Sequence, residues 1–252
     1  MHTLAVGEDE RLLFIADLHL GAERPATTAA LLAFLTDTAP GCQRLFILGD
    51  LFEYWIGDDD DHPVAARVAT ALHALSEGGT ACYFMAGNRD FLLGEAYARR
   101  AGLTRLDDPT LLAGPNLKLL LMHGDTLCTD DKPYQAFRAQ VRNPAWQADF
   151  LSRPLEVRRA MAEQARSHSR IATAGKAEAI MDVNADAVVA ALASAGSPDL
   201  LHGHTHRPGC HPVNTAERLC RRWVLADWTD RPEYLAWDGV RMQPLSGAPA
   251  PN

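Results

Sequence analysis

Five short apolar runs divide the chain and predict its core strands. They span residues 12–16, 45–48, 82–86, 119–122 and 200–201, and each is followed at once by glycine or by a polar residue. Short, unbroken apolar runs are typical of strands that are buried on both faces of a sheet. We therefore expect five core strands at these positions.

Apolar residues at helical spacing predict helices between the runs. We expect one helix from about Thr28, a second from Pro63, a third over Glu95–Arg100 and a fourth from Asn184. From Thr110 onward the pattern changes to short runs separated by turns. A βαβαβ half followed by a β-rich half packs as two sheets with helices outside, so the expected fold is a four-layer α-β-β-α sandwich of the α/β class.

The interval between Asp125 and Leu200 is longer than a crossover between two core strands requires. We expect an inserted helical cap over residues 126–180. From Lys132 to Lys176 there are nine Lys and Arg residues against three acidic ones. The same stretch contains the aromatic residues Tyr134, Phe137, Trp146 and Phe150. The cap is either a solvated helical pair or a basic, aromatic cover over a site that handles an anionic amphiphile.

Composition excludes several classes of protein. The 252 residues are enough for one core, so we expect a single domain over residues 1–252 with the cap inside it. A net charge of -8 argues against nonspecific binding of nucleic acid. No apolar stretch is long enough for a transmembrane helix, and the first residues lack the pattern of a signal peptide, so we expect a cytoplasmic protein. The five scattered cysteines predict reduced thiols.

The residues that follow the apolar runs are of the types that bind divalent metals. An Asp after a strand is usually a helix cap or a turn residue. However, ligands of parallel α/β sheets sit beyond the carboxyl ends of the strands, so side chains from five such ends converge on one place. Carboxylate, amide and imidazole groups suit hard to borderline metals. We expect two metal ions with these ligands: Asp17, His19, Asp50, Asn88, His123, His204 and His206.

The spacing of the ligands suggests how they are shared. Asp17 and His19 reach one ion if the chain curls between them, and Asp50 can bridge both ions through its two oxygens. In a simple strand, His204 and His206 would lie on one face and reach adjacent ions. Three further residues, His202, Asp125 and Asp227, also follow apolar runs or lie near the expected ligands in the sequence. We expect them to support the site rather than to bind metal.

Two adjacent metals lower the pKa of water and neutralise phosphoryl oxygens, which predicts hydrolysis of a phosphoester or phosphoanhydride. The ordered motifs DxH, GD, GN, H and GHxH, from Asp17 to His206, resemble the calcineurin-like metallophosphoesterase superfamily. Many members of that superfamily have GNH in the third motif, where this chain has Arg89. Arginine cannot donate a proton near pH 7. Because a phosphate leaving group needs little protonation, Arg89 favours a pyrophosphate substrate and would contact its phosphoryl oxygens.

A closer resemblance rests on longer motifs. The stretches 17–21 (DLHLG), 49–58 (GDLFEYWIGD), 87–92 (GNRDFL), 123–131 (HGDTLCTDD), 180–184 and 202–208 are similar to the UDP-2,3-diacylglucosamine hydrolase family of the lipid A pathway. The resemblance implies hydrolysis of UDP-2,3-diacylglucosamine to UMP and 2,3-diacylglucosamine 1-phosphate by a hydroxide that two Mn2+ ions activate, with Mg2+ or Co2+ as possible substitutes. It also implies a peripheral enzyme at the cytoplasmic face of the inner membrane, with a lipid-linked nucleotide as substrate and no obligate protein partner.

The resemblance further implies the roles of individual residues. It makes Asp50, Asn88 and Arg89 the catalytic residues, and it places substrate contacts at Asn88, Arg89, Asp131, Ser169, Thr173, Lys176 and His204. Family members often have Asn at the position of Thr173, whose hydroxyl offers fewer hydrogen bonds than an amide. Two alternatives stay open: a dimetal phosphodiesterase or phosphatase of other specificity, and a scaffold without catalytic activity.

Overall fold

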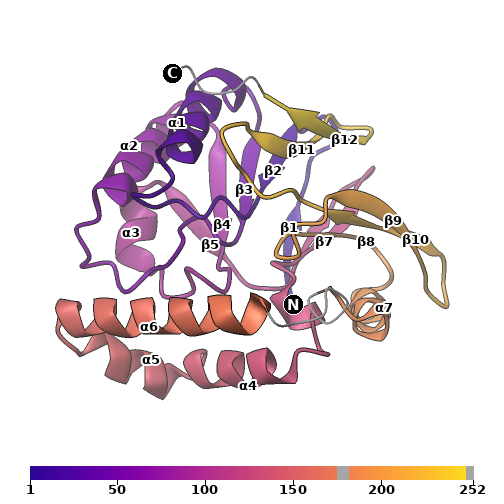
Figure 1. The fold of residues 1–252 in the computed structure, drawn as a ribbon. Coiled ribbons are helices and arrows are strands. Elements are labelled where there is room, and N and C mark those ends of the chain that lie inside the picture. Colours follow the sequence, from indigo (N-terminus) through magenta and orange to yellow (C-terminus); the bar gives the residue numbers. More distant parts are fainter. Residues whose placement is uncertain (175–181, 248–252) are drawn as a thin grey trace.

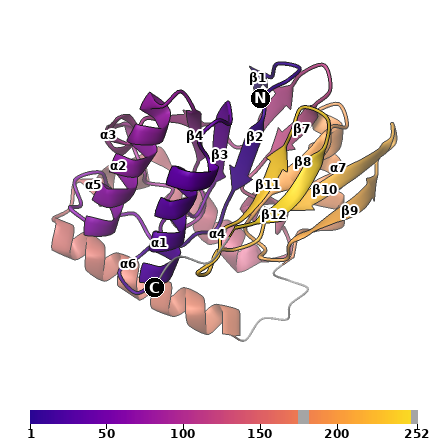
Figure 2. The same ribbon diagram turned by 90° about the horizontal axis from the view of Figure 1, so that it is seen from above.

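The chain forms two six-stranded sheets (Figures 1 and 2). The computed structural model describes residues 1–174 and 182–247, and over residues 168–174 it describes the backbone alone. The first sheet runs in the order β12 (Met242–Ser246), β11 (Glu233–Trp237), β2 (Leu12–Ile15), β3 (Arg44–Leu48), β4 (Ala81–Met85) and β5 (Leu103–Leu106). The second runs in the order β1 (His2–Ala5), β6 (Thr110–Ala113), β7 (Lys118–Leu121), β8 (Asp199–His202), β10 (Leu219–Val224) and β9 (Gly209–Asn214).

Helices cover the outer faces of both sheets. The first sheet packs against α1 (Pro25–Ala33), α2 (Pro63–Glu77) and α3 (Glu95–Arg100), and the second packs against α7 (Ala185–Ser194). The four-layer α/β sandwich expected from the sequence is therefore confirmed. The predicted start of the first helix at Thr28 is wrong: α1 begins at Pro25, because proline at the first helical position has the required φ and needs no N–H partner.

The apolar runs are unbroken because both faces of the strands are buried. In β2, Leu13 and Ile15 pack into the core beneath the helices, whereas Leu12 and Phe14 pack into the core between the sheets. The ring of Phe14 stacks on Phe46 of β3 with 5.1 Å between ring centroids. Alternating side chains thus serve two different cores, which is why the strands read as continuous apolar sequence.

The loops that leave the core strands meet at one edge of the sandwich. Strands β2, β3 and β4 are parallel in the first sheet, and β7 and β8 are parallel in the second. The N–H of Asp17 donates to the carbonyl of Gly49 at 3.1 Å, and the N–H of Gly203 donates to the carbonyl of His123 at 2.9 Å. These bonds join neighbouring loops, so the polar residues after the strands are brought together.

Three α-helices lie in the described part of the interval where the sequence predicts a cap. They are α4 (Lys132–Val141), α5 (Pro144–Leu151) and α6 (Leu155–Ala174), and they run together along one side of the molecule (Figure 1). Residues 175–180 of the predicted cap lie outside the described residues. We refer to residues 132–174 as the cap helices.

The positive charge of the cap helices pairs with carboxylates of the sandwich. Arg158 of α6 donates to both carboxylate oxygens of Asp59, and Arg159 donates to Asp60 at 2.6 Å. Phe150 of α5 is buried in the same core as the helices of the first sheet. The cap helices are therefore packed and paired with the body, which differs from a solvated helical pair.

The five cysteines all lie in the described part of the chain, and none of them forms a disulfide. Within the described ranges, no helix has the length and apolar character needed to cross a membrane.

Candidate metal centre

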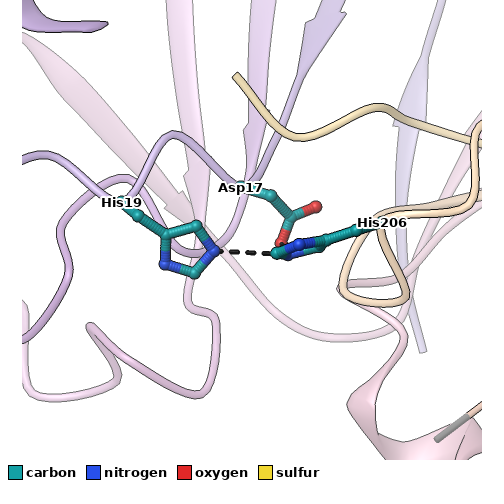
Figure 3. A group of neighbouring side chains, drawn as sticks. All are labelled: Asp17, His19 and His206. Carbon is teal, nitrogen blue, oxygen red and sulfur yellow. Dashed lines mark hydrogen bonds and ion pairs between the residues drawn. The ribbon is translucent and has the colours of Figure 1, made fainter. Parts of the chain in front are cut away.

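One group of candidate ligands comprises Asp17, His19 and His206 (Figure 3). Nε2 of His206 lies 3.6 Å from Oδ1 of Asp17 and 3.3 Å from Nε2 of His19. Asp17 is fully buried; its Oδ2 accepts the N–H of His204 at 2.8 Å, whereas its Oδ1 accepts no hydrogen bond from the residues that the structure describes. Three candidate ligand atoms thus face one another, and one of them is a buried oxygen without a hydrogen bond to any described residue.

A second group comprises Asp50, His123 and His204. Nδ1 of the buried His123 lies 2.9 Å from the carbonyl of Leu48, which can only accept a hydrogen bond, so Nδ1 is the protonated nitrogen. Nε2 of His123 faces the other candidate ligands, 3.8 Å from Oδ1 of Asp50 and 2.9 Å from Oδ1 of Asn88. The ring of His204 lies 5.1 Å from that of His123.

Asp50 lies between the two groups. Its Oδ1 faces His123 of the second group, and its Oδ2 lies 3.9 Å from Nε2 of His19 in the first. The carboxylate is almost completely buried. A side chain whose two oxygens face two separate ligand groups has the geometry of a bridging ligand.

The backbone conformation at these residues is unusual. Six non-glycine residues in the described part of the chain have positive φ, and five of them are candidate ligands: Asp17, His19, Asp50, His204 and His206, with φ between 50° and 68°. Left-handed conformations cost free energy in L-residues and concentrate at functional sites. His204 and His206 follow β8 in a loop, so the prediction of a simple strand is wrong for them, and left-handed turns direct them to different groups.

Two motif glycines provide space for ligands that come from other strands. A Cβ on Gly87 would lie 2.1 Å from Oδ1 of Asp50, and a Cβ on Gly203 would lie 2.3 Å from Oδ2 of Asp17. Side chains at either position would overlap a carboxylate of the centre. The glycines of the GN and GH motifs are therefore required by close approach between loops.

The electrostatics of the pocket favour a cation. Burial disfavours the charged form of His123, but Asp50, Asp125 and Asp17 outweigh it and raise the pKa of His123 to about 9. Burial and the neighbouring His123 lower the pKa of His204 to about 4. The carboxylates thus attract positive charge into a buried space, and oxygen and imidazole donors with one unpartnered carboxylate oxygen suit a pair of divalent metals.

A family model described as calcineurin-like phosphoesterase matches residues 10–208. The chain belongs to this family. The phosphoesterase is 56% identical over 228 residues to the UDP-2,3-diacylglucosamine hydrolase of Aromatoleum aromaticum, covering 90% of this chain and 93% of that protein. It is 50% identical over 233 residues to the protein of the same name from Stenotrophomonas maltophilia, covering 90% and 94% of the two chains. These relatives confirm the predicted resemblance.

Among solved structures, the phosphoesterase is similar to the cold-active protein-tyrosine phosphatase of a psychrophilic Shewanella species, with a TM-score of 0.40 and 12% identity over 96% of this chain and 82% of that chain. A likeness at this level does not bear on the activity.

Asp90 organises two loops of the phosphoesterase, a role that its sequence position did not reveal. Its buried carboxylate accepts backbone N–H groups from Gly87 at 2.9 Å and Leu51 at 2.7 Å, and from Asp50 and Phe52 at 3.3 Å. These bonds fix the turn that carries Asn88 against the turn that carries Asp50. The only sequence signal was the position of Asp90 inside the GNRD motif.

Asp125 lies outside the two ligand groups and connects the centre to the cap helices. Tyr134 and Arg138 of α4 donate to its Oδ2 at 2.6 and 2.8 Å. Burial would raise the pKa of Asp125, but His123 and Arg138 outweigh it and keep this pKa below its usual range. Nε2 of the buried His202 lies 3.1 Å from Nη1 of Arg222, and Oδ2 of Asp227 lies 3.8 Å from Nδ1 of His206. His202 and Asp227 therefore flank the candidate ligands.

The structure describes the side chains of some of the predicted substrate contacts but not of others. Asn88, Arg89 and His204 lie at the centre, where the N–H of Arg89 donates to Asp50 at 2.8 Å. Asp131 caps α4 and accepts the N–H of Tyr134. The side chains of Ser169 and Thr173, and all of Lys176, lie outside the described residues.

Proposed function

We propose that this phosphoesterase hydrolyses the pyrophosphate bond of UDP-2,3-diacylglucosamine to UMP and 2,3-diacylglucosamine 1-phosphate, with two Mn2+ ions, as a step of lipid A biosynthesis. The observation that carries the proposal is the position of Asp50 between two groups of candidate ligands. The shared name of the relatives supplies the substrate.

In this proposal Asp17, His19 and His206 would hold one ion, and Asp50, Asn88, His123 and His204 would hold the other, with Asp50 as a ligand to both. When bound, the ions would lower the pKa of water toward neutrality and neutralise phosphoryl oxygens. The hydrogen bond from Nδ1 of His123 to Leu48 keeps Nε2 available as a ligand.

Arg89 favours cleavage of a phosphoanhydride bond. Its guanidinium is permanently charged, so it stabilises charge on phosphoryl oxygens but cannot protonate a leaving group. The sugar phosphate that leaves has a second pKa of about 6 and needs no proton to leave, whereas an alkoxide does. An arginine in the GN motif therefore suits a phosphoanhydride better than a phosphomonoester.

In this proposal the cap helices cover the acyl chains, and the substrate contacts include Asp131, Ser169, Thr173 and Lys176. Phe137 is 47% exposed and offers apolar surface, whereas the hydroxyl of Tyr134 is occupied by Asp125. Burial of acyl chains is worth about 0.8 kcal/mol per CH2. We place the enzyme at the cytoplasmic face of the inner membrane as a peripheral protein, because its substrate carries two acyl chains.

The test is turnover of UDP-2,3-diacylglucosamine against bis-p-nitrophenyl phosphate, with added Mn2+. We expect kcat/KM to be higher for the lipid-linked nucleotide by orders of magnitude. Asp50→Ala should abolish both reactions. His73→Ala replaces an exposed side chain of α2 and should leave both reactions unchanged. Equal kcat/KM values for the two substrates would favour a phosphodiesterase of other specificity, and equal activity of the two variants would contradict the site.

A further inference from the structure

Glu53 connects a candidate metal ligand to the cap helices. It follows Asp50 by three residues, and its side chain is 22% exposed. One carboxylate oxygen, Oε2, lies 3.2 Å from Nδ1 of His19. The other, Oε1, lies 3.2 Å from Nε of Arg166 on α6 and 4.0 Å from Nη1 of Arg89. No role for Glu53 follows from the metal motifs themselves.

The contact with His19 bears on which nitrogen of the ring can bind metal. Nε2 of His19 faces His206 at 3.3 Å and Oδ2 of Asp50 at 3.9 Å, so it is the nitrogen on the metal side. Nε2 binds a metal only when the proton is on Nδ1, and the buried Nδ1 has no well-aligned hydrogen bond to any described residue. Oε2 of Glu53 is the acceptor at hydrogen-bonding distance. Carboxylates on the far side of a ligating histidine fix its tautomer and raise its basicity.

Arg166 holds Glu53 from the side of the cap. Its Nη2 donates to Glu23 at 2.8 Å, and its guanidinium lies 5.2 Å from the centroid of the Tyr54 ring. These two contacts fix the guanidinium, so that Nε is presented to Oε1 of Glu53. The charges of Arg166 and Glu53 are opposite and both side chains are largely buried, so solvent screens the pair weakly.

We propose that Glu53 is a positioning residue for His19 and that Arg166 positions Glu53, so that docking of α6 tightens the metal centre. This inference rests on the proposed function, because it takes Nε2 of His19 as a metal ligand. Its physical basis is a continuous chain of contacts from α6 through one carboxylate to one imidazole. Loss of the cap contact would release Glu53, and the ring of His19 would then sample orientations that do not bind metal.

The experiment measures Mn2+ affinity by isothermal titration calorimetry and by electron paramagnetic resonance of free Mn2+, on full-length protein freed of metal. Glu53→Ala should weaken one of the two sites by about 10- to 100-fold. Glu53→Gln retains an acceptor for Nδ1 and should recover part of the loss. Arg166→Ala should weaken the same site by about 2- to 30-fold.

Arg159→Ala is the matched control, because Arg159 lies on the same helix and pairs with Asp60 and Asp61, away from the ligands. It should leave Mn2+ affinity unchanged. Circular dichroism and thermal unfolding would verify that each variant is folded.

The outcomes separate this inference from the proposed function. A parent protein that binds two Mn2+ ions and a folded Glu53→Ala variant with the same two affinities would overturn the inference alone. The inference would also be wrong if Arg159→Ala weakened binding as much as Arg166→Ala. A parent protein that binds no Mn2+ would overturn the proposed function and the inference with it.

Discussion

Replacement of Gly87 by alanine tests how closely the loops of the centre approach one another. Gly87 precedes Asn88, and its α-carbon lies against the loop of Asp50. A Cβ at this position would lie 2.1 Å from Oδ1 and 2.4 Å from the backbone nitrogen of Asp50. One of these atoms belongs to the backbone and the other ends a short, buried side chain, so the whole residue has to shift.

The size of that shift gives the expected effect. Real Cβ contacts are essentially never shorter than 3.0 Å, so Oδ1 has to move from 2.1 Å to at least that distance. A displacement approaching 1 Å at a reacting centre can lower the rate by about 100-fold. Forcing a methyl group into a packed site also costs about 1–3 kcal/mol of unfolding free energy. We therefore expect Gly87→Ala to lose about 100-fold in kcat/KM and to bind Mn2+ more weakly.

The assay compares Gly87→Ala with Gly7→Ala in turnover of the lipid-linked nucleotide, Mn2+ titration and urea unfolding. Gly7 is a matched control, because its φ is also not positive and a Cβ there would meet the side chain of Glu10 at 3.3 Å. Gly7→Ala should behave like the parent protein. Wild-type activity and Mn2+ affinity in Gly87→Ala would refute the close approach of the two loops.

Two further predictions concern the connection between the cap helices and the centre. Tyr134→Phe removes a hydrogen bond to the buried, charged Asp125, so the free energy of unfolding should fall by about 1.5–3 kcal/mol in urea titrations; an unchanged value would mean that the bond is not formed. Burial would raise the pKa of Glu53, but His19, Arg89 and Arg166 outweigh it and lower this pKa to about 2. Because the folded-state pKa is depressed, the stabilisation is complete above the ordinary pKa of 4.5 and is lost as the pH falls from there toward 2. Glu53→Gln should therefore lose less unfolding free energy than the parent between pH 6 and pH 3, and equal losses would contradict the ion pairs.

The strand ends were predictable because a buried strand next to a titratable residue leaves a clear pattern in the sequence. The run 45–48 before Gly49 and Asp50 is such a case, and the structure places Asp50 directly after β3. Parallel strands then require their carboxyl ends to meet at one edge, so the meeting of Asp17, Asp50 and His123 followed from topology. The ligation itself stays a prediction.

Other features depend on contacts that no local pattern encodes. Asp90 accepts four backbone N–H groups, and this depends on how the Asp50 loop folds over it. The arginines of α6 indicated excess charge, but their partners Asp59 and Asp60 are about 100 positions away in the sequence. The left-handed turns at His204 and His206 were missed because alternating residues are ordinarily assigned to a strand.

The most direct test of the central claim is hydrolysis of UDP-2,3-diacylglucosamine in 18O-labelled water with Mn2+, followed by mass spectrometry of both products. The proposed function predicts UMP and 2,3-diacylglucosamine 1-phosphate in equal amounts, with the label in UMP, because water attacks the phosphorus nearer to uridine. Asp50→Ala should release neither product. Label in the lipid phosphate would contradict the direction of attack, and a folded, Mn2+-loaded protein that releases no UMP would contradict the function.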